Sequence, residues 1–541
     1  MKSFVRYFRT SFLIGAVASL GAVVALPAAA QTDFHGDILL GRPTDRSIAV
    51  SVMSFRDTQV YVEYGDASEN YTNSSPTQEI VDGDVQVFEI EGLDSNTEYF
   101  YRLRYKSNTS QIEQDFAHTP EYSFNTARPA GASFNFAVTA DPHLGARTRF
   151  EKWCGPRCTR EAADDEIYTE TVENMLSYDP DFLVDLGDFF MTSQNHGNGL
   201  FPIQNQQGGA PITEQEVLDD VLYVRSLMVQ GGSSIPMFLV QGNHEAEDSA
   251  RLDGTPDNMA VWAVNARKKY FPSPTDNHFY SGPTTEYEFI GRQDGHYSWE
   301  WGDALFVALD PFWEQNPCNG PWCDSLGKAQ FDWLKETLEN SDAAFKFVFL
   351  HHLVGGLDNP YGGNRGGALY SDYFEWGGRT PFDVENWDSA NYEAYQAQVQ
   401  DAEGGPPKIR RVDSSTESYD FEQYRPGWGG KSIQDILLEN GVQIVFHGHD
   451  HLYVRENHAN GLVYQEVPQP SRRSPGGEGL LVAAGNQGYD YEQGVVVSGT
   501  GFVNVSVSPD EVRVDYVQNA DGCESDGPCN QFADTYMVYP Q

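Results

Sequence analysis

Five short polar clusters, each following an apolar run, constrain the fold of this chain more than any other feature. The clusters are Asp141-Pro142-His143, Gly187-Asp188, Gly242-Asn243-His244-Glu245, His351-His352 and Gly448-His449-Asp450-His451. The apolar runs before them are residues 134–138, 182–184, 237–240, 345–350 and 442–446. Short apolar runs bounded by turn residues predict buried strands, and open α/β sheets bind ligands outside the carboxyl ends of their strands. We therefore expect these distant side chains to converge at one sheet edge.

The clusters supply carboxylate, amide and imidazole donors, enough for two adjacent metal ions. Two metals about 3.5–4 Å apart can activate water and neutralise phosphoryl oxygens together, which hydrolysis of a phosphate ester requires. An anionic bridge must hold two cations that close, and the carboxylate of Asp188 can serve. Imidazole and carboxylate donors suit iron, manganese or zinc rather than calcium. The sequence has neither a G-x-S-x-G elbow nor a Walker loop, so serine-hydrolase and P-loop chemistry are not indicated.

In order and composition the clusters resemble the motifs of the calcineurin-like metallophosphoesterase superfamily, D-x-H, G-D, G-N-H-D/E, H and G-H-x-H. The resemblance covers about residues 133–516. It implies two divalent or trivalent ions (Fe, Mn or Zn), one held by Asp141, His143, Asp188 and His451, the other by Asp188, Asn243, His351 and His449. It also implies in-line attack of a metal-bound hydroxide on phosphorus, with His244 as the acid or transition-state stabiliser and Glu245 orienting His244.

The stretch Gly448–Arg455 also resembles the G-H-V-H-x-Y-E-R motif of purple acid phosphatases. Those enzymes have Gly where His143 stands, and a tyrosine ligand where this chain has Met191. We therefore predict no purple charge-transfer colour. His352 and His447 flank expected ligands. Each is interpreted either as a group that orients a neighbouring ligand or as a buried structural histidine. His196, in the loop after Asp188, could reach substrate, but a solvent-facing loop residue is favoured. Arg365 belongs to a glycine-rich loop and could clamp a phosphate.

The expected fold class is α/β, in two domains. Residues 33–128 alternate strands and turns, and Leu93–Tyr99 looks like the tyrosine corner of an all-β, fibronectin III-like sandwich. Such a domain precedes the catalytic domain in purple acid phosphatases. Residues 133–541 are expected to form a four-layer α/β/β/α metallophosphoesterase sandwich, with helices at 161–177, 328–340 and 432–440. Insertions are expected at about 190–234 and 353–430.

The N-terminus predicts export. Basic residues at positions 2, 6 and 9 precede an apolar stretch from 11 to 26 and Ala28-Ala29-Ala30, the pattern of a signal peptide at 1–30 cleaved near Ala30. We expect a secreted or periplasmic protein with no membrane anchor. Its six cysteines form three close pairs, 154/158, 318/323 and 523/529, which predict local disulfides. Zinc binding by the first pair is the alternative.

The formal net charge of −44 excludes a polyanion-binding surface of the usual kind, so no nucleic-acid partner is expected. The predicted function is hydrolysis of a small phosphate monoester. A phosphodiesterase is the first alternative, because D-x-H and a long aromatic insert leave diesters open. An inactive metal-binding module and a surface-binding adhesin built on the sandwich are the others.

Overall fold

The structure is a computed structural model. It describes residues 34–108, 115–144, 165–189, 213–245, 247, 252–313, 326–353, 367–368, 429–458, 461–471, 494–497, 499–519 and 530–540. The predicted signal peptide, all six cysteines, Met191, His196 and Arg365 lie outside these residues. In the described part, no helix is both long and apolar enough to cross a membrane.

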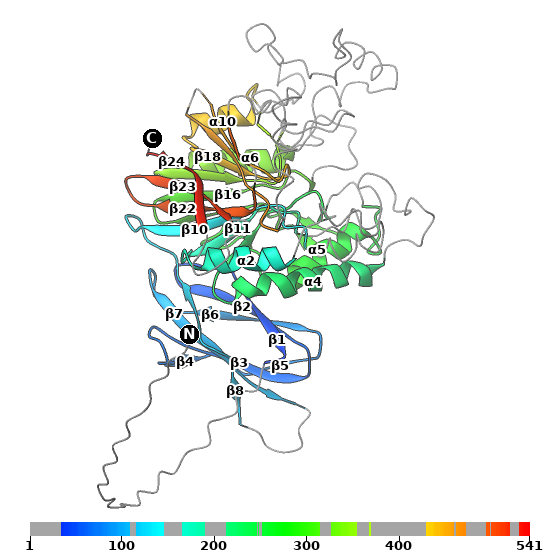
Figure 1. The fold of residues 1–541 in the computed structure, drawn as a ribbon. Helices are drawn as coiled ribbons and strands as arrows, with labels where there is room; N and C mark the ends of the chain where they lie inside the picture. Colours follow the sequence, from blue (N-terminus) through cyan, green and yellow to red (C-terminus); the bar gives the residue numbers. More distant parts are fainter. Residues whose placement is uncertain are drawn as a thin grey trace, which may run out of the picture.

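The N-terminal part is a pair of β-sheets that enclose their own core (Figure 1). One sheet has the order β1-β2-β6, and the other β4-β3-β7-β8, with β5 beside β3 and β9 beside β7. The strands are β1 Gly36–Gly41, β2 Ser47–Ser54, β3 Thr58–Gly65, β4 Asn73–Ser74, β5 Gln78–Ile80, β6 Val85–Glu91, β7 Glu98–Ser107, β8 Ala117–His118 and β9 Tyr122–Asn125. The backbone N–H of Asp94 donates to the Tyr99 hydroxyl at 3.0 Å, the contact that a tyrosine corner makes.

Two larger sheets pack face to face in the second part. The first has the order β12-β11-β10-β22-β23-β24, and the second β15-β16-β17-β18-β20-β19-β21. Their strands are β10 Phe134–Thr139, β11 Phe182–Asp185, β12 Met237–Leu239, β15 Tyr297–Trp301, β16 Ala304–Ala308, β17 Phe345–Phe349, β18 Ile444–His447, β19 Tyr453–Asn457, β20 Val463–Glu466, β21 Gly494–Val497, β22 Gly501–Val507, β23 Val512–Asn519 and β24 Asn530–Val538. A short hairpin, β13 Glu286–Tyr287 with β14 Gly291–Arg292, lies apart from both. Aromatic side chains fill the space between the sheets: Phe136 lies 5.2 Å from Phe306 and Phe349 5.1 Å from Phe446, between ring centroids.

Helices cover the outer face of each sheet, which completes the predicted α/β/β/α order (Figure 1). Helices α2 Asp165–Leu176, α4 Glu214–Gly232 and α5 Met259–Tyr270 lie toward the N-terminal sandwich, whereas α6 Gly327–Glu339 and α10 Ile433–Glu439 lie on the far side. Helix α10 begins with a capping box of Ser432 and Asp435, and the chain leaves it through Gly441 at φ 70°. Helices α4 and α5 were not predicted, and α4 occupies much of the expected 190–234 insertion.

A buried arginine joins the sandwich to the helical layer. Arg225 of α4 is fully buried, and its Nε donates to the Asp37 carboxylate at 2.8 Å. Its other nitrogens donate to Ser51 and to the carbonyl of Tyr270. A buried guanidinium needs its donors satisfied, so this contact ties α4, and through it the first sheet, to the N-terminal strands.

Candidate metal centre

The five polar clusters meet where the carboxyl ends of parallel strands from both sheets come together. Asp141, Asp188 and Asn243 follow β10, β11 and β12, which are neighbouring parallel strands. His351 and His449 follow β17 and β18, a neighbouring parallel pair in the other sheet. The convergence expected at a sheet edge is therefore present, but it is built from two sheets rather than one.

Strained backbone is concentrated at this edge. Ten described residues other than glycine have positive φ, and five of them belong to the clusters: Asp141 (57°), His143 (46°), Asp188 (59°), His449 (86°) and His451 (60°). Such conformations cost on the order of 1 kcal/mol or more each for residues with a Cβ, and they persist where the surroundings over-determine them. The fold therefore holds these side chains in place against local preference.

Glycines at the same edge let the loops approach one another. A Cβ on Gly242 would lie 2.3 Å from Asp188 Oδ1, and a Cβ on Gly448 would lie 2.6 Å from Asp141 Oδ2. Gly187 has a φ of 98°, and a Cβ at this position would collide with the backbone nitrogen of Gly242. The G-D, G-N-H and G-H motifs therefore need glycine because side chains there would displace the carboxylates.

The first predicted set of donors lies on one side of the cluster. His143 Nε2 is 3.0 Å from His451 Nε2 and 3.8 Å from Asp141 Oδ1, while His451 Nε2 is 3.4 Å from the same oxygen. Asp141 Oδ1 is buried and makes no hydrogen bond with any described residue. Its other oxygen accepts from the His449 backbone N–H at 2.7 Å, so the carboxylate is fixed with one oxygen directed at the imidazoles.

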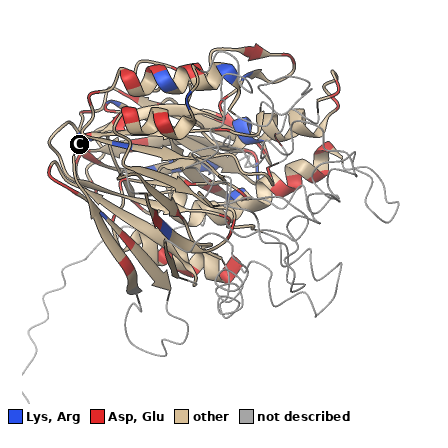
Figure 2. Cartoon of the chain, turned by 90° about the horizontal axis from the view of Figure 1, so that it is seen from above, with Lys and Arg blue, Asp and Glu red and all other residues tan. Residues whose placement is uncertain are grey.

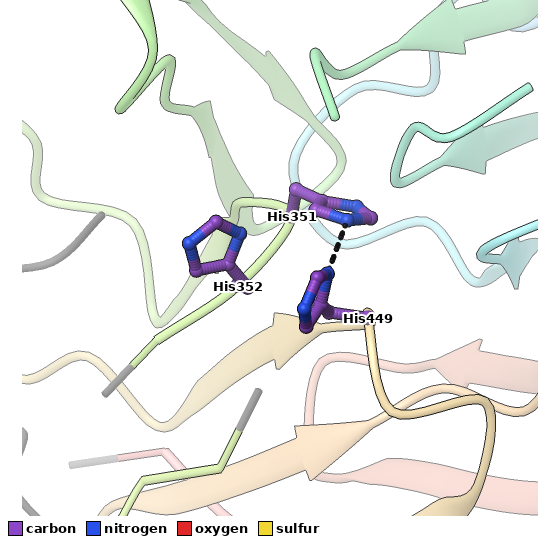
Figure 3. A group of neighbouring side chains, drawn as sticks. All are labelled: His351, His352 and His449. Carbon is purple, nitrogen blue, oxygen red and sulfur yellow. Dashed lines mark hydrogen bonds between the residues drawn. The ribbon is translucent and has the colours of Figure 1, made fainter. Parts of the chain in front are cut away.

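The second predicted set surrounds His351. Its Nε2 lies 3.1 Å from His449 Nδ1, as Figure 3 shows. The same nitrogen lies 3.1 Å from Asn243 Oδ1 and 3.2 Å from Asp188 Oδ2. Its Nδ1 lies 3.0 Å from the Leu186 carbonyl oxygen, which can only accept a hydrogen bond. The neutral ring must therefore carry its proton on Nδ1 and present an unprotonated Nε2 to the cluster.

These spacings fit the donor atoms of bound metals. Bonds of about 2.0–2.1 Å place neighbouring donors on one ion roughly 3.0–3.4 Å apart, and four of the closest donor pairs lie 3.0–3.2 Å apart. Asp188 Oδ2 is 3.2 Å from His351 Nε2 and 3.8 Å from His143 Nε2, so this carboxylate reaches both sets. The residues present therefore fit two ions that share Asp188.

His244 and Glu245 lie beside the bridge. His244 Nε2 is 3.6 Å from Asp188 Oδ2, and the His244 backbone N–H donates to Asp188 Oδ1 at 2.8 Å. Glu245 Oε2 accepts from the backbone N–H groups of Asp188 and Gly242, which joins the two loops. The role of Glu245 in orienting His244 stays a prediction, while its cross-linking role was not foreseen.

One residue that supports the site belongs to none of the five motifs. Glu466, at the end of β20, is fully buried, and its Oε1 accepts from the Asp450 backbone N–H at 2.8 Å. It thereby holds the loop that carries His449 and His451. Glu466 comes shortly after the apolar residues Val463 and Tyr464. It therefore fits the same pattern as the motifs, in which a polar residue stands at the end of an apolar strand.

The Y-x-R part of the stretch that resembles purple acid phosphatases has a structural contact in this chain. The Tyr453 hydroxyl donates to Asp534 Oδ2 at 2.8 Å, and Arg455 Nε donates to the same oxygen at 2.7 Å. Asp534 lies on β24 of the other sheet. These residues join the two sheets.

The charges of the cluster suit cation binding. Burial would raise the pKa values of Asp188 and Asp141, but the neighbouring imidazoles outweigh it and lower both, so the carboxylates are ionised. Burial and the adjacent His451 lower the pKa of His143 to about 3, which leaves its imidazole neutral. Burial alone would lower the pKa of His351, but Asp188 and Asp141 overcome it and raise the pKa to about 9.

Metal affinity at the His351 position is therefore expected to rise with pH. Below about pH 9 the metal-free His351 holds a proton that a cation must displace, whereas His143 holds none. Each pH unit should strengthen binding at the His351 position roughly tenfold, so about a hundredfold between about pH 6 and pH 8. Chelator competition on metal-free protein measures both positions, and equal pH dependence at the two would contradict this assignment.

Comparison with known proteins places this site in a class. Residues 134–365 match the model of the calcineurin-like phosphoesterase family. This part of the chain is thus a calcineurin-like phosphoesterase domain, and the resemblance is confirmed for the four motifs that lie within it.

Two solved structures share the fold over most of the chain. A structure described as PhoD has 13% identity and a TM-score of 0.57, covering 95% of this chain and 92% of that one. Purple acid phosphatase PPD1 from yellow lupin (Lupinus luteus) seeds has 14% identity and a TM-score of 0.52, covering 93% of this chain and 74% of that one. No curated protein sequence matches the chain.

Proposed function

We propose that this protein is an exported, dinuclear metal-dependent phosphomonoesterase. The observation that carries the proposal is the largely buried donor cluster, in which Asp188 Oδ2 lies within 3.8 Å of a histidine nitrogen from each predicted donor set. Iron, manganese and zinc all suit its imidazole, amide and carboxylate donors. Two such ions, when bound, lower the pKa of water and offset the negative charge of a phosphoryl group.

The residues of the chain would orient the reacting groups. Asp188 and the two donor sets would hold the cations, and the strained backbone of their loops fixes where the donor side chains lie. His244 is buried beside Asp188, 5.0 Å from the His143 ring between centroids, so its imidazole borders the cluster. In the proposed reaction it stabilises the phosphoryl oxygens or gives a proton to the leaving group.

The choice of monoester rests on architecture. Both the β-sandwich and the phosphoesterase part align with the lupin purple acid phosphatase, over 93% of this chain. Diester hydrolysis is the alternative, because His143 occupies a position where purple acid phosphatases have glycine, and its Nε2 is directed at His451. A neutral imidazole at this place adds a nitrogen donor to the first metal position without changing its charge.

Turnover of matched aryl phosphate monoesters and diesters tests the proposal. The purified mature protein, loaded with Mn, Zn or Fe, is compared with His244→Asn and with His458→Asn, a histidine packed on Tyr464 away from the cluster. We expect higher kcat/KM on the monoester and a fall of at least about a hundredfold in His244→Asn, the scale of a proton-transfer group. His458→Asn should retain wild-type activity.

Other outcomes would change the assignment. A much higher kcat/KM on the diester would make the protein a phosphodiesterase. Metal binding without turnover of either ester would favour an inactive module. Unchanged activity in His244→Asn would remove this histidine from the reaction.

Export is a separate part of the proposal, and it rests on the basic and apolar pattern of residues 1–30. Acidic positions outnumber basic ones along the described chain, as Figure 2 shows from above, consistent with 79 Asp and Glu against 35 Lys and Arg in the whole chain. Mass spectrometry of the protein recovered from periplasm and medium should find a mature N-terminus near Gln31. A full-length chain confined to the cytoplasm would contradict export.

A further inference from the structure

A third imidazole accompanies the second predicted donor set. His352 directly follows His351, and its ring lies beside that of His449, as Figure 3 shows. The ring centroids of His352 and His449 are 4.7 Å apart, and those of His351 and His352 are 5.6 Å apart. One nitrogen from each of the three rings can be chosen so that all lie within 4.8 Å of one another.

The end of β17 explains how consecutive histidines reach the same place. Side chains of consecutive residues in a regular strand point to opposite faces of the sheet. The strand ends at Phe349, however, so the chain turns out of the pleat before His351. Phe312 then packs against both rings, with centroid distances of 6.1 Å to His351 and 5.2 Å to His352.

The environment of His352 suits a ligand more than a surface residue. The residue is only 3% exposed, and its ring lies beside the two imidazoles that are predicted to bind the second ion. A cation placed among the three rings would therefore face one nitrogen from each.

We propose that His352 is a nitrogen donor to the second metal ion, and that this makes the two metal positions chemically different. The second position would then hold His351, His352 and His449 with Asn243 and the shared Asp188. The first position keeps Asp141 as a carboxylate of its own. Nitrogen-rich sites favour borderline cations such as zinc, whereas carboxylates suit manganese better. The second position should therefore discriminate more strongly for zinc over manganese.

This inference rests on the proposed dinuclear site, and metal binding tests it without any turnover. Metal-free wild type, His352→Gln and His296→Gln are titrated with zinc and with manganese against a chelator, and bound metal is counted by elemental analysis. His296 is the control, because it is a partly buried histidine packed on an aromatic ring, with a centroid distance of 4.7 Å to Trp333, and it lies outside the clusters.

We expect wild type and His296→Gln to bind two zinc ions per chain. In His352→Gln one zinc should bind about a hundredfold more weakly or be lost, by analogy with the upper range for loss of a group that supports a ligand. Manganese binding at the same position should weaken less. Zinc affinity equal to wild type for both ions in a folded His352→Gln would overturn the proposal.

X-ray absorption of the wild-type dizinc protein supplies a measurement that needs no variant. The proposal predicts a total of five imidazole ligands for the two zinc ions together. A total of four imidazole ligands would overturn it. Absence of the dinuclear site would look different, because wild type itself would then bind fewer than two ions. Loss of turnover with two ions bound would contradict the proposed function and leave the assignment of His352 standing.

Discussion

Asp188→Asn is expected to lower kcat/KM by on the order of a thousandfold or more and to reduce bound metal from two ions to at most one. The Asp188 carboxylate lies 3.2 Å from His351 Nε2, 3.6 Å from His244 Nε2 and 3.8 Å from His143 Nε2. An amide keeps the shape but replaces one anionic oxygen with an N–H group that repels cations. A loss of several kcal/mol of charge stabilisation corresponds to a rate effect of this size.

The matched control is Asp185→Asn, the same substitution three residues earlier. Asp185 is fully buried, accepts from the Thr139 hydroxyl at 2.7 Å and from the Gly187 N–H at 3.1 Å, and belongs to neither donor set. Burial raises the pKa of Asp185 to about 7, so an uncharged amide resembles the state this group readily adopts. Asp185→Asn should keep two metals and activity within about tenfold. Two tightly bound metals in Asp188→Asn would refute the bridging role.

Arg267→Met should destabilise the fold by about 3–5 kcal/mol, the usual result of removing one partner from a buried ion pair. Arg267 of α5 is 1% exposed and pairs with two buried carboxylates, Glu247 at 2.8 Å and Asp294 at 2.7 Å. Glu247 lies two residues after Glu245. The ion pairs of Arg267 therefore anchor the chain close to the candidate metal centre. Urea unfolding of the metal-free protein measures the loss.

The pH dependence of that loss identifies its cause. Burial already raises the pKa of Glu247 although Arg267 opposes it, and removing the guanidinium should raise this pKa further. A carboxyl group whose pKa is higher in the folded state costs stability above its unfolded pKa of about 4.3. The deficit of Arg267→Met should therefore be largest near neutral pH and shrink as the pH falls toward 4. A triple variant that adds Glu247→Gln and Asp294→Asn should recover part of the stability. A pH-independent deficit would indicate lost packing instead.

Two helices show where sequence interpretation fell short. In α4 the buried residues Val217, Val221, Val224 and Met228 recur at helical spacing after the capping box of Thr213 and Glu216, so the signal was present. Helix α5 gave a weaker signal, because its buried side includes Arg267 as well as apolar residues. A charged residue in the core becomes recognisable only when its partners from other segments are known.

The candidate site was more predictable than the helices around it. Each motif couples a polar donor to the end of an apolar strand, and parallel strands bring such ends to one edge, so Asp141, Asp188, Asn243, His351 and His449 could be grouped from the sequence. The unpredicted supports, Glu466 and Phe312, belong to no motif and act through contacts that link distant segments.

The sequence by itself determined the class of chemistry, because donor type and strand-end position are local properties of the chain. It also indicated the two-part architecture, since alternating strands in residues 33–128 differ in period from the later strand and helix pattern. Only the tertiary structure decided that the edge is built from two sheets, that Asp188 lies within reach of both donor sets, and that His352 joins His351 and His449. These features depend on how the faces of the two sheets pack and where each strand ends, and such long-range packing has no local signature in the chain.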